Sequence, residues 1–97
     1  MDDAKKPFAE IATRLKWHRQ IAGMNQDDYA RAIGLKRSQL ANFENGDFRL
    51  SLDGAIALKR RFGLSLDFLF LGDTEGLPEA LRTTWQDRAA KNAGAQR

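Results

Sequence analysis

The chain contains no cysteine and only one histidine among its 97 residues. The lack of thiols excludes disulfides and thiolate metal sites, and a reducing compartment such as the cytoplasm is expected. With a single histidine, a zinc site would depend on carboxylates, so we expect neither a metal nor another cofactor. No apolar run approaches the length of a membrane span, and acidic residues follow Met1, so we expect no membrane anchor or secretion signal.

The residue groupings that enzymes need are also missing. No carboxylate pair lies in an obviously apolar segment, and no serine or cysteine is placed to pair with the histidine. No glycine-rich phosphate-binding loop occurs either. We therefore expect a binding protein and not an enzyme.

What the chain does have is an uneven distribution of charge. The net charge is only +3, but residues 14–61 carry ten Lys and Arg against five Asp and Glu. The other segments carry six against eight, so the positive charge is concentrated in the centre of the chain. This pattern favours a polyanionic partner, although an ordinary solvated surface can have the same composition.

Helical periodicity, interrupted by glycines, runs through most of the chain. Apolar residues recur at helical spacing and no segment alternates with period two, so helices are expected and strands are not. Asn25, Ser51 and Ser65 are suitable N-caps. We predict an all-α bundle of five helices, at residues 7–22, 26–33, 37–45, 52–62 and 66–71, followed by a linker at 73–76 and a helical tail.

The apolar stripes indicate which sides of these helices face the core. The stripe of the first helix comprises Phe8, Ile11, Ala12, Leu15 and Ala22. The stripe of the fourth comprises Leu52, Ala55, Ile56 and Phe62. Trp17 and Ile21 lie off the first stripe and form a candidate docking face.

The third predicted helix has a polar side that suits DNA bases. On a helical wheel Leu40 and Phe43 point inward, toward Tyr29, Ile33 and Leu35. The opposite side carries Ser38, Ala41, Asn42 and Asn45, with Lys36 and Arg37 at the N-terminal end. Arginine can bind guanine with two hydrogen bonds, asparagine can do the same with adenine, and alanine can contact a thymine methyl group. A solvated helix face would contain the same residue types, so this helix alone leaves both interpretations open.

A resemblance favours DNA. Residues 8–72 resemble the lambda repressor/Cro-like helix-turn-helix family, in which the second of two short helices enters the major groove. The matching residues are Arg19, Gly23, Gln26, Ala30, Gly34, Leu35, Leu40, Phe43, Glu44, Gly46 and the closing Leu64-Ser65-Leu66-Asp67-Phe68-Leu69…Gly72. Together, in register over two-thirds of the chain, they imply a five-helix DNA-binding domain.

The resemblance also implies roles for individual residues. It implies base contacts by Arg37, Ser38 and Asn42, joined by Ala41 from the wheel. It implies contacts to the DNA backbone by Gln26 and Asn45. Lys36 and Arg49 flank this row, and we expect them to bind DNA phosphates as well. It further implies a partly buried ion pair between Arg19 and Glu44 that fixes the third helix to the first.

Two positions depart from the family pattern. Lys36 replaces the usual serine or threonine cap of the third helix, so that cap is expected to be lost. His18 replaces a larger apolar residue, and we expect it to be a partly buried packing residue and not a ligand or a base.

The last predicted helix of the bundle has more apolar residues than one face can hide. We expect Phe70, with Phe68 or Leu71, to lie near the surface as candidate dimer contacts. The tail stripe of Leu77, Leu81 and Trp85 covers either its own subunit or a neighbour's. A homodimer is favoured, because two recognition helices about 34 Å apart can read adjacent major grooves.

We therefore interpret residues 1–6 as an N-terminal arm, 7–72 as the DNA-binding domain and 73–97 as a linker and tail for dimerisation or docking. The expected function is sequence-specific binding of double-stranded DNA as a transcriptional repressor, in the cytoplasm of a bacterium or encoded by a phage, on the nucleoid. The alternative is a helical module that binds another protein, such as an antitoxin-like partner or an adaptor. Affinity for duplex DNA that falls steeply with salt would distinguish the two.

Overall fold

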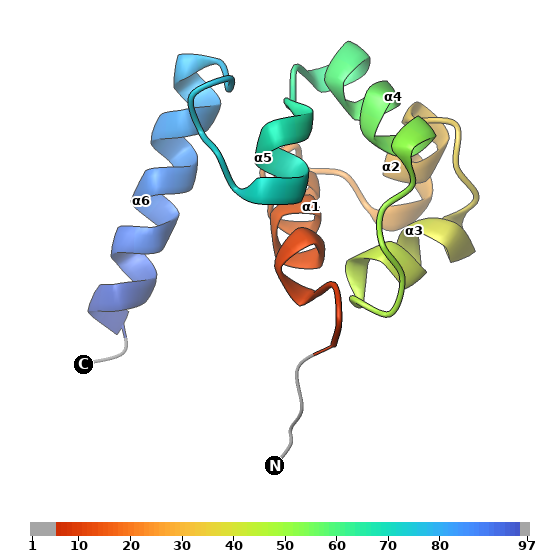
Figure 1. The fold of residues 1–97 in the computed structure, drawn as a ribbon, viewed down its shortest axis with the longest axis horizontal. Coiled ribbons are helices and arrows are strands. Elements are labelled where there is room, and N and C mark those ends of the chain that lie inside the picture. Colours follow the sequence, from red (N-terminus) through yellow and green to blue (C-terminus); the bar gives the residue numbers. More distant parts are fainter. Residues whose placement is uncertain (1–5, 96–97) are drawn as a thin grey trace.

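The computed structural model describes residues 6–95, with side chains described as far as Arg88. This part of the chain forms six helices and no strand (Figure 1). The bounds are α1 Ala9–Ile21, α2 Gln26–Ala32, α3 Arg37–Glu44, α4 Leu52–Phe62, α5 Leu66–Leu71 and α6 Glu79–Ala95. The all-helical prediction, a five-helix bundle followed by a helical tail, is confirmed. Residues 1–5 of the predicted arm and residues 96–97 lie outside the described part.

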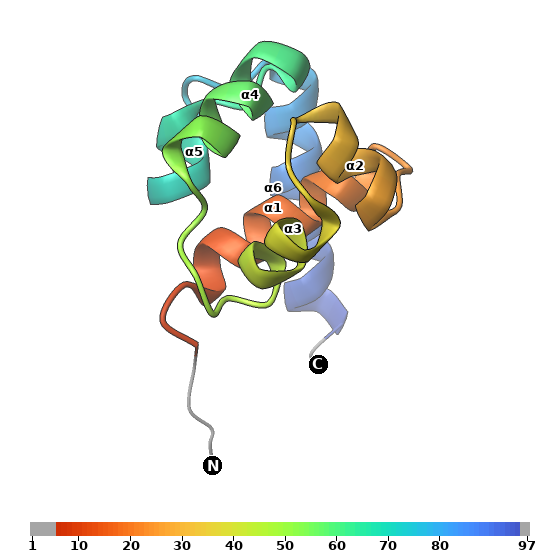
Figure 2. The same cartoon turned by 90° about the vertical axis from the view of Figure 1, so that its right-hand side faces the viewer.

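Helix α1 lies in the centre of the molecule. Helices α2, α3 and α4 are on one side of it, and α6 is on the other, beyond α5 (Figure 1; Figure 2 shows α3 in front of α1 and α6 behind it). The largest fully buried side chains come from every helix of the bundle and from the loops between them. They are Leu15, Tyr29, Leu40, Leu50, Leu58, Leu64, Phe68 and Leu69.

Helix ends form where the capping residues predict them. The side chains of Asn25, Ser51 and Ser65 each accept a hydrogen bond from the backbone N–H three residues later, at 2.8–3.0 Å. These bonds pair N–H groups that have no partner within the helix. Gly63 and Gly72 end α4 and α5 in the left-handed conformation. Within residues 6–95 no helix is both long and apolar enough to cross a membrane.

Two glycines allow backbone segments to approach closely. Gly46 has a φ of +84°, and a Cβ there would lie 3.3 Å from the Cα of Ala9, so the end of α3 packs directly against the start of α1. The backbone N–H of Phe8 also donates to the carbonyl of Gly46 at 3.1 Å. Gly54 of α4 is buried against the side chains of Leu35 and Leu50. These approaches fix α3 between α1 and the loop that leads to α4.

The predicted inner faces of α1 and α4 need correction. Leu52 is 60% exposed, because the buried face of α4 passes through Gly54, Ala55 and Leu58. Ala22 is exposed, whereas Trp17 is only 5% exposed. Since α1 is the central helix, neighbours pack against more of its circumference than one apolar stripe predicts.

The tail folds back onto its own chain. The ring of Trp85 lies 5.0 Å from that of Trp17 and 5.2 Å from that of Phe68, in edge-to-face geometry. Leu77 is buried, and Leu81 packs against the same core. Phe68 is completely buried, so its prediction as a surface contact for a dimer is wrong. Of the other predicted contacts, Leu71 is 69% exposed and Phe70 is partly buried.

Candidate nucleic-acid interface

Helices α2 and α3 are joined by a turn of four residues. Gly34 has a φ of +73°, a conformation that side chains with a Cβ disfavour. The backbone N–H of Leu35 donates to the carbonyl of Ala30 at 2.8 Å and closes the turn. Tyr29, Ala30 and Ile33 are buried as predicted, so α2 is anchored and sets the direction of α3.

Helix α3 exposes its polar side. Leu40 is completely buried and Phe43 partly buried. The side chains predicted to contact bases occupy the opposite side: Arg37, Ser38 and Asn42 are exposed and Ala41 is partly exposed. Helix α6 lies on the far side of α1 and does not cover this face (Figure 1). A polar row on a short exposed helix can enter a major groove, which is about 12 Å wide.

The N-terminus of α3 has half of a capping box. Lys36 provides no side-chain acceptor, as the sequence predicts. Instead, Oε1 of Gln39 accepts a hydrogen bond from the backbone N–H of Lys36 at 2.9 Å. Gln39, which the sequence analysis did not single out, therefore defines the start of the helix. The exposed Lys36 ammonium remains beside Arg37 at this end.

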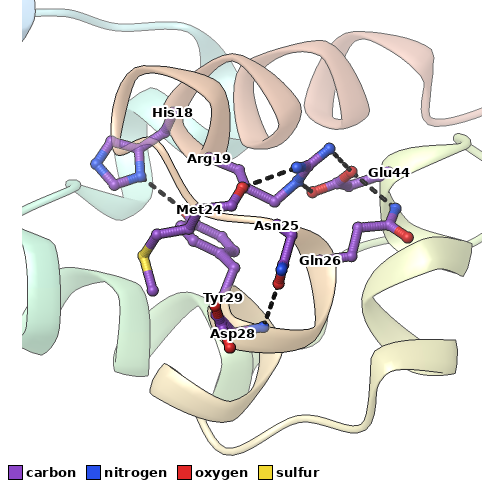
Figure 3. A network of polar contacts seen from close by, with 8 residues as sticks. All are labelled: His18, Arg19, Met24, Asn25, Gln26, Asp28, Tyr29 and Glu44. Carbon is purple, nitrogen blue, oxygen red and sulfur yellow. Dashed lines mark hydrogen bonds and ion pairs between the residues drawn. The ribbon is translucent and has the colours of Figure 1, made fainter.

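A buried ion pair ties α3 to α1 (Figure 3). Nε of Arg19 donates to Oε2 of Glu44 at 2.7 Å, and Nη2 donates to Oε1 at 3.1 Å. The third nitrogen, Nη1, donates to the carbonyl of Met24 at 2.9 Å. The Glu44 side chain is only 2% exposed. This is the pair expected from the sequence, and its bidentate geometry holds the last turn of α3 in one orientation.

Gln26 extends this network to the start of α2. Its Nε2 donates to Oε1 of Glu44 at 3.1 Å (Figure 3). One amide hydrogen is therefore used inside the protein, whereas the other and the carbonyl oxygen stay free to bind outward. A phosphate contact at Gln26 is expected from the sequence, but the hydrogen bond to Glu44 that orients the side chain carries no sequence signal.

Asn45 and Arg49, which are predicted to contact the DNA backbone, lie beyond the C-terminus of α3. Oδ1 of Asn45 accepts a hydrogen bond from the backbone N–H of Asp47 at 3.0 Å, which leaves its amide hydrogens free. The guanidinium of Arg49 lies over the ring of Phe8, 5.1 Å from its centre. Both residues are exposed, at the end of α3 and on the loop that follows it.

His18 has a structural place in this unit. It is 4% exposed, and its Nδ1 shares a 2.6 Å hydrogen bond with the hydroxyl of Tyr29 (Figure 3). Burial lowers the pKa of His18 to about 4 and raises that of the Tyr29 hydroxyl. His18 is thus a neutral packing residue that joins α1 to α2, as expected. Among the described residues, no group of histidines and carboxylates is arranged to hold a metal ion.

Two residues of α1 that the sequence analysis overlooked lie beside this interface. Lys16 and Gln20 line a hollow of about 260 Å³ together with Gln26, Ala41 and Asn45. They are near Arg19 in sequence, and residues three or four apart in a helix share a face. The helical spacing could have placed Lys16 beside Arg19, but not against α3.

Comparisons with known proteins agree with this geometry. The sequence profile of the helix-turn-helix family matches residues 15–69 of the chain. Two Archaeoglobus fulgidus proteins, each named an uncharacterized HTH-type transcriptional regulator, are 32% identical over 67 residues and 31% identical over 69 residues. These alignments cover 69% and 71% of this chain, and 96% and 97% of the relatives.

A Methanocaldococcus jannaschii protein with the same kind of name is 28% identical over 61 residues, which are 63% of this chain and 92% of that protein. These relatives are archaeal and give no support to a bacterial or phage origin. No match was found among solved structures. The matched segment, residues 15–69, contains the whole α2–α3 unit, and α6 lies outside it.

Proposed function

Because the chain belongs to the lambda repressor/Cro-like helix-turn-helix family of DNA-binding regulators, we propose that it represses transcription as a dimer whose α3 helices read the major groove. A bound protein blocks a promoter simply by occupying it, so a small DNA-binding domain suffices for repression. We place this activity on the nucleoid, inside the cell, and assign it no catalytic step.

One observation carries the proposal: the polar side of α3 is exposed while its apolar side and both of its ends are fixed. The ion pair and Gly46 hold the C-terminal end, and the glycine turn and Gln39 define the N-terminal end. Because the backbone of α3 is already fixed, only its side chains lose conformational entropy when they meet the bases.

The proposed contacts divide into two kinds. Arg37, Ser38, Ala41 and Asn42 face base edges and read sequence. Gln26, Lys36, Asn45 and Arg49 bind phosphates around them and set the orientation of the domain. The start of α2 also presents free backbone N–H groups, which favour an anion at that point.

Replacing Arg37 by alanine is expected to change sequence preference. One bidentate contact to guanine contributes about 1–3 kcal/mol of discrimination, so preference at one base pair per half-site should relax. Selection of bound duplexes from a random pool, for the wild type and for R37A, measures this. R49A is the control, because loss of a phosphate contact should weaken all duplexes alike. The same selected motif for R37A and the wild type would remove Arg37 from base readout.

The dimer contact is proposed at the exposed end of α5. The apolar stripe of the tail is largely used within its own subunit, whereas Leu71 is 69% exposed beside the partly buried Phe70. A single exposed leucine is ordinary on a protein surface, but Leu71 adjoins Phe70 in the chain, and apolar patches at the surface mark subunit interfaces. Leu81 and Trp85, the remaining predicted contacts, are partly buried against the core of their own subunit.

Replacing Leu71 by glutamate is therefore expected to lower the sedimentation mass from dimer to monomer. A charge buried in a two-fold interface lies near its own symmetry copy, which repels it. L52E adds the same charge at another exposed leucine, 60% exposed on α4, and should leave the mass unchanged. A dimer that persists in L71E would place the interface elsewhere.

A further inference from the structure

Two adjoining hollows, here together called the furrow, extend from the candidate DNA interface across α1 to the tail. The hollow beside Gln26 and Ala41 has a volume of about 260 Å³. A second hollow, of about 270 Å³, contains Arg88 of α6. The two share the residues Lys16, Gln20, Glu44 and Asn45. The proposed phosphate contact Asn45 therefore lines the same hollow as a cation of the tail, and Gln26 lines the adjoining one.

The furrow is positively charged. Its ionisable lining residues are Lys16, Arg19, Arg88 and Glu44, which give a net charge of +2. The one carboxylate is hidden, because the Glu44 side chain is 2% exposed and accepts hydrogen bonds from Arg19 and Gln26. Lys16 is exposed and Arg88 partly exposed, so an anion in the furrow meets cations.

The tail holds Arg88 in place. Its guanidinium carbon lies over the ring of Trp85, 4.6 Å from the centre. Trp85 in turn packs against Trp17 and Phe68 of the buried core. A guanidinium stacked on a fixed ring has already lost part of the freedom that a mobile surface arginine would lose on binding.

We propose that this furrow binds the phosphate backbone of DNA next to the groove that α3 reads, and that Arg88 and Lys16 supply the contacts. This inference rests on the proposed function. DNA is the partner favoured by continuity, because Gln26, Ala41 and Asn45 line the same surface as the two cations. Arginine and lysine are the usual partners of phosphate oxygens. Helix α6, outside the matched segment, thereby becomes part of the DNA-binding surface.

The test replaces Arg88 by glutamine and measures affinity for the selected duplex from 0.1 to 1 M salt. Each phosphate neutralised on B-DNA adds about −0.9 to the slope of log K against log salt. A dimer loses one such contact in each subunit, so R88Q should have a slope shallower by about 1.8. Its affinity should be about 60-fold lower at 0.1 M salt and should approach the wild-type value near 1 M.

Two variants serve as controls. R88K keeps the positive charge, so its slope of log K against log salt should stay close to that of the wild type. R82Q removes an arginine of α6 that lines neither hollow, and should bind like the wild type.

An R88Q slope equal to that of the wild type overturns the inference, even if affinity falls, because a purely structural role of Arg88 would not change the number of ions released. Failure of the proposed function looks different: the wild type itself would then show no salt-dependent binding to any selected duplex. If the wild type binds with a steep slope that R88Q shares, only the role of the tail is lost.

Discussion

Replacing Arg19 by methionine is expected to lower the free energy of unfolding by about 3–5 kcal/mol. The Glu44 carboxylate would stay buried, with a side chain 2% exposed, and would lose the two hydrogen bonds that Arg19 donates at 2.7 and 3.1 Å. Only the bond from Gln26 would remain. A buried charge left without its partner is among the most destabilising changes a point mutation can make.

Urea denaturation of R19M and the wild type measures this effect. Arg31 provides a matched control, because it forms a 2.6 Å ion pair with Asp27 in which both side chains are more than half exposed. An exposed pair four residues apart in a helix contributes only about 0.3–0.5 kcal/mol, so R31M should have little effect. Similar losses for R19M and R31M would refute the structural role of the buried pair.

The double variant R19M/E44L separates buried charge from packing. It removes both charges, and replacing a buried pair by apolar residues is often neutral or stabilising. We expect it to be more stable than R19M. Its affinity for DNA should still fall, because Gln26 loses its internal acceptor and α3 loses its bidentate attachment to α1. A double variant that is no more stable than R19M would show that the unpaired carboxylate is not the cause.

Acid is expected to destabilise the protein through His18. Burial lowers the pKa of His18 in the folded protein from 6.5 to about 4. Below pH 6.5 the unfolded chain takes up a proton at this residue while the folded protein does not. The free energy of unfolding should therefore fall as the pH decreases from 6.5 to 4, by about 3 kcal/mol in total, and this contribution should be fully present above pH 6.5.

The single histidine makes the measurement direct. The difference in unfolding free energy between the wild type and H18Q, measured from pH 8 to pH 4, isolates the effect of His18 because carboxylates contribute to both. Glutamine can still form a hydrogen bond with the Tyr29 hydroxyl but does not titrate in this range. The difference should change between pH 6.5 and 4 and stay constant above. A difference that does not vary with pH would show that folding does not shift the pKa of His18.

The ends of the helices could be predicted because the residues that cap or stop a helix lie at those ends themselves. Asn25, Ser51 and Ser65 cap helices with their own side chains, and Gly63 and Gly72 end them through their own backbone conformation. The polar side of α3 follows from the helical period alone. Its use for base readout stays a proposal, because exposure shows only that the residues are accessible.

The surroundings of individual side chains could not be predicted in the same way. Trp17 and Phe68 were expected near the surface, but Trp85, far away in the sequence, covers both. Leu52 was expected inside and is outside, because α4 buries the face that carries Gly54, Ala55 and Leu58. Such contacts depend on how helices dock, and the pattern within one helix does not encode the partner.

By itself, the sequence determined where the helices begin and end, the type of fold and the row of polar residues on α3, since caps, turns and helical periods act over a few residues. Tertiary structure decided what those residues do together. It formed the hydrogen bond from Gln26 to Glu44 and packed Trp85 of the tail against Trp17. It also brought Arg88 into the same hollow as Lys16. These arrangements join segments up to 72 residues apart, so they exist only after the chain has packed.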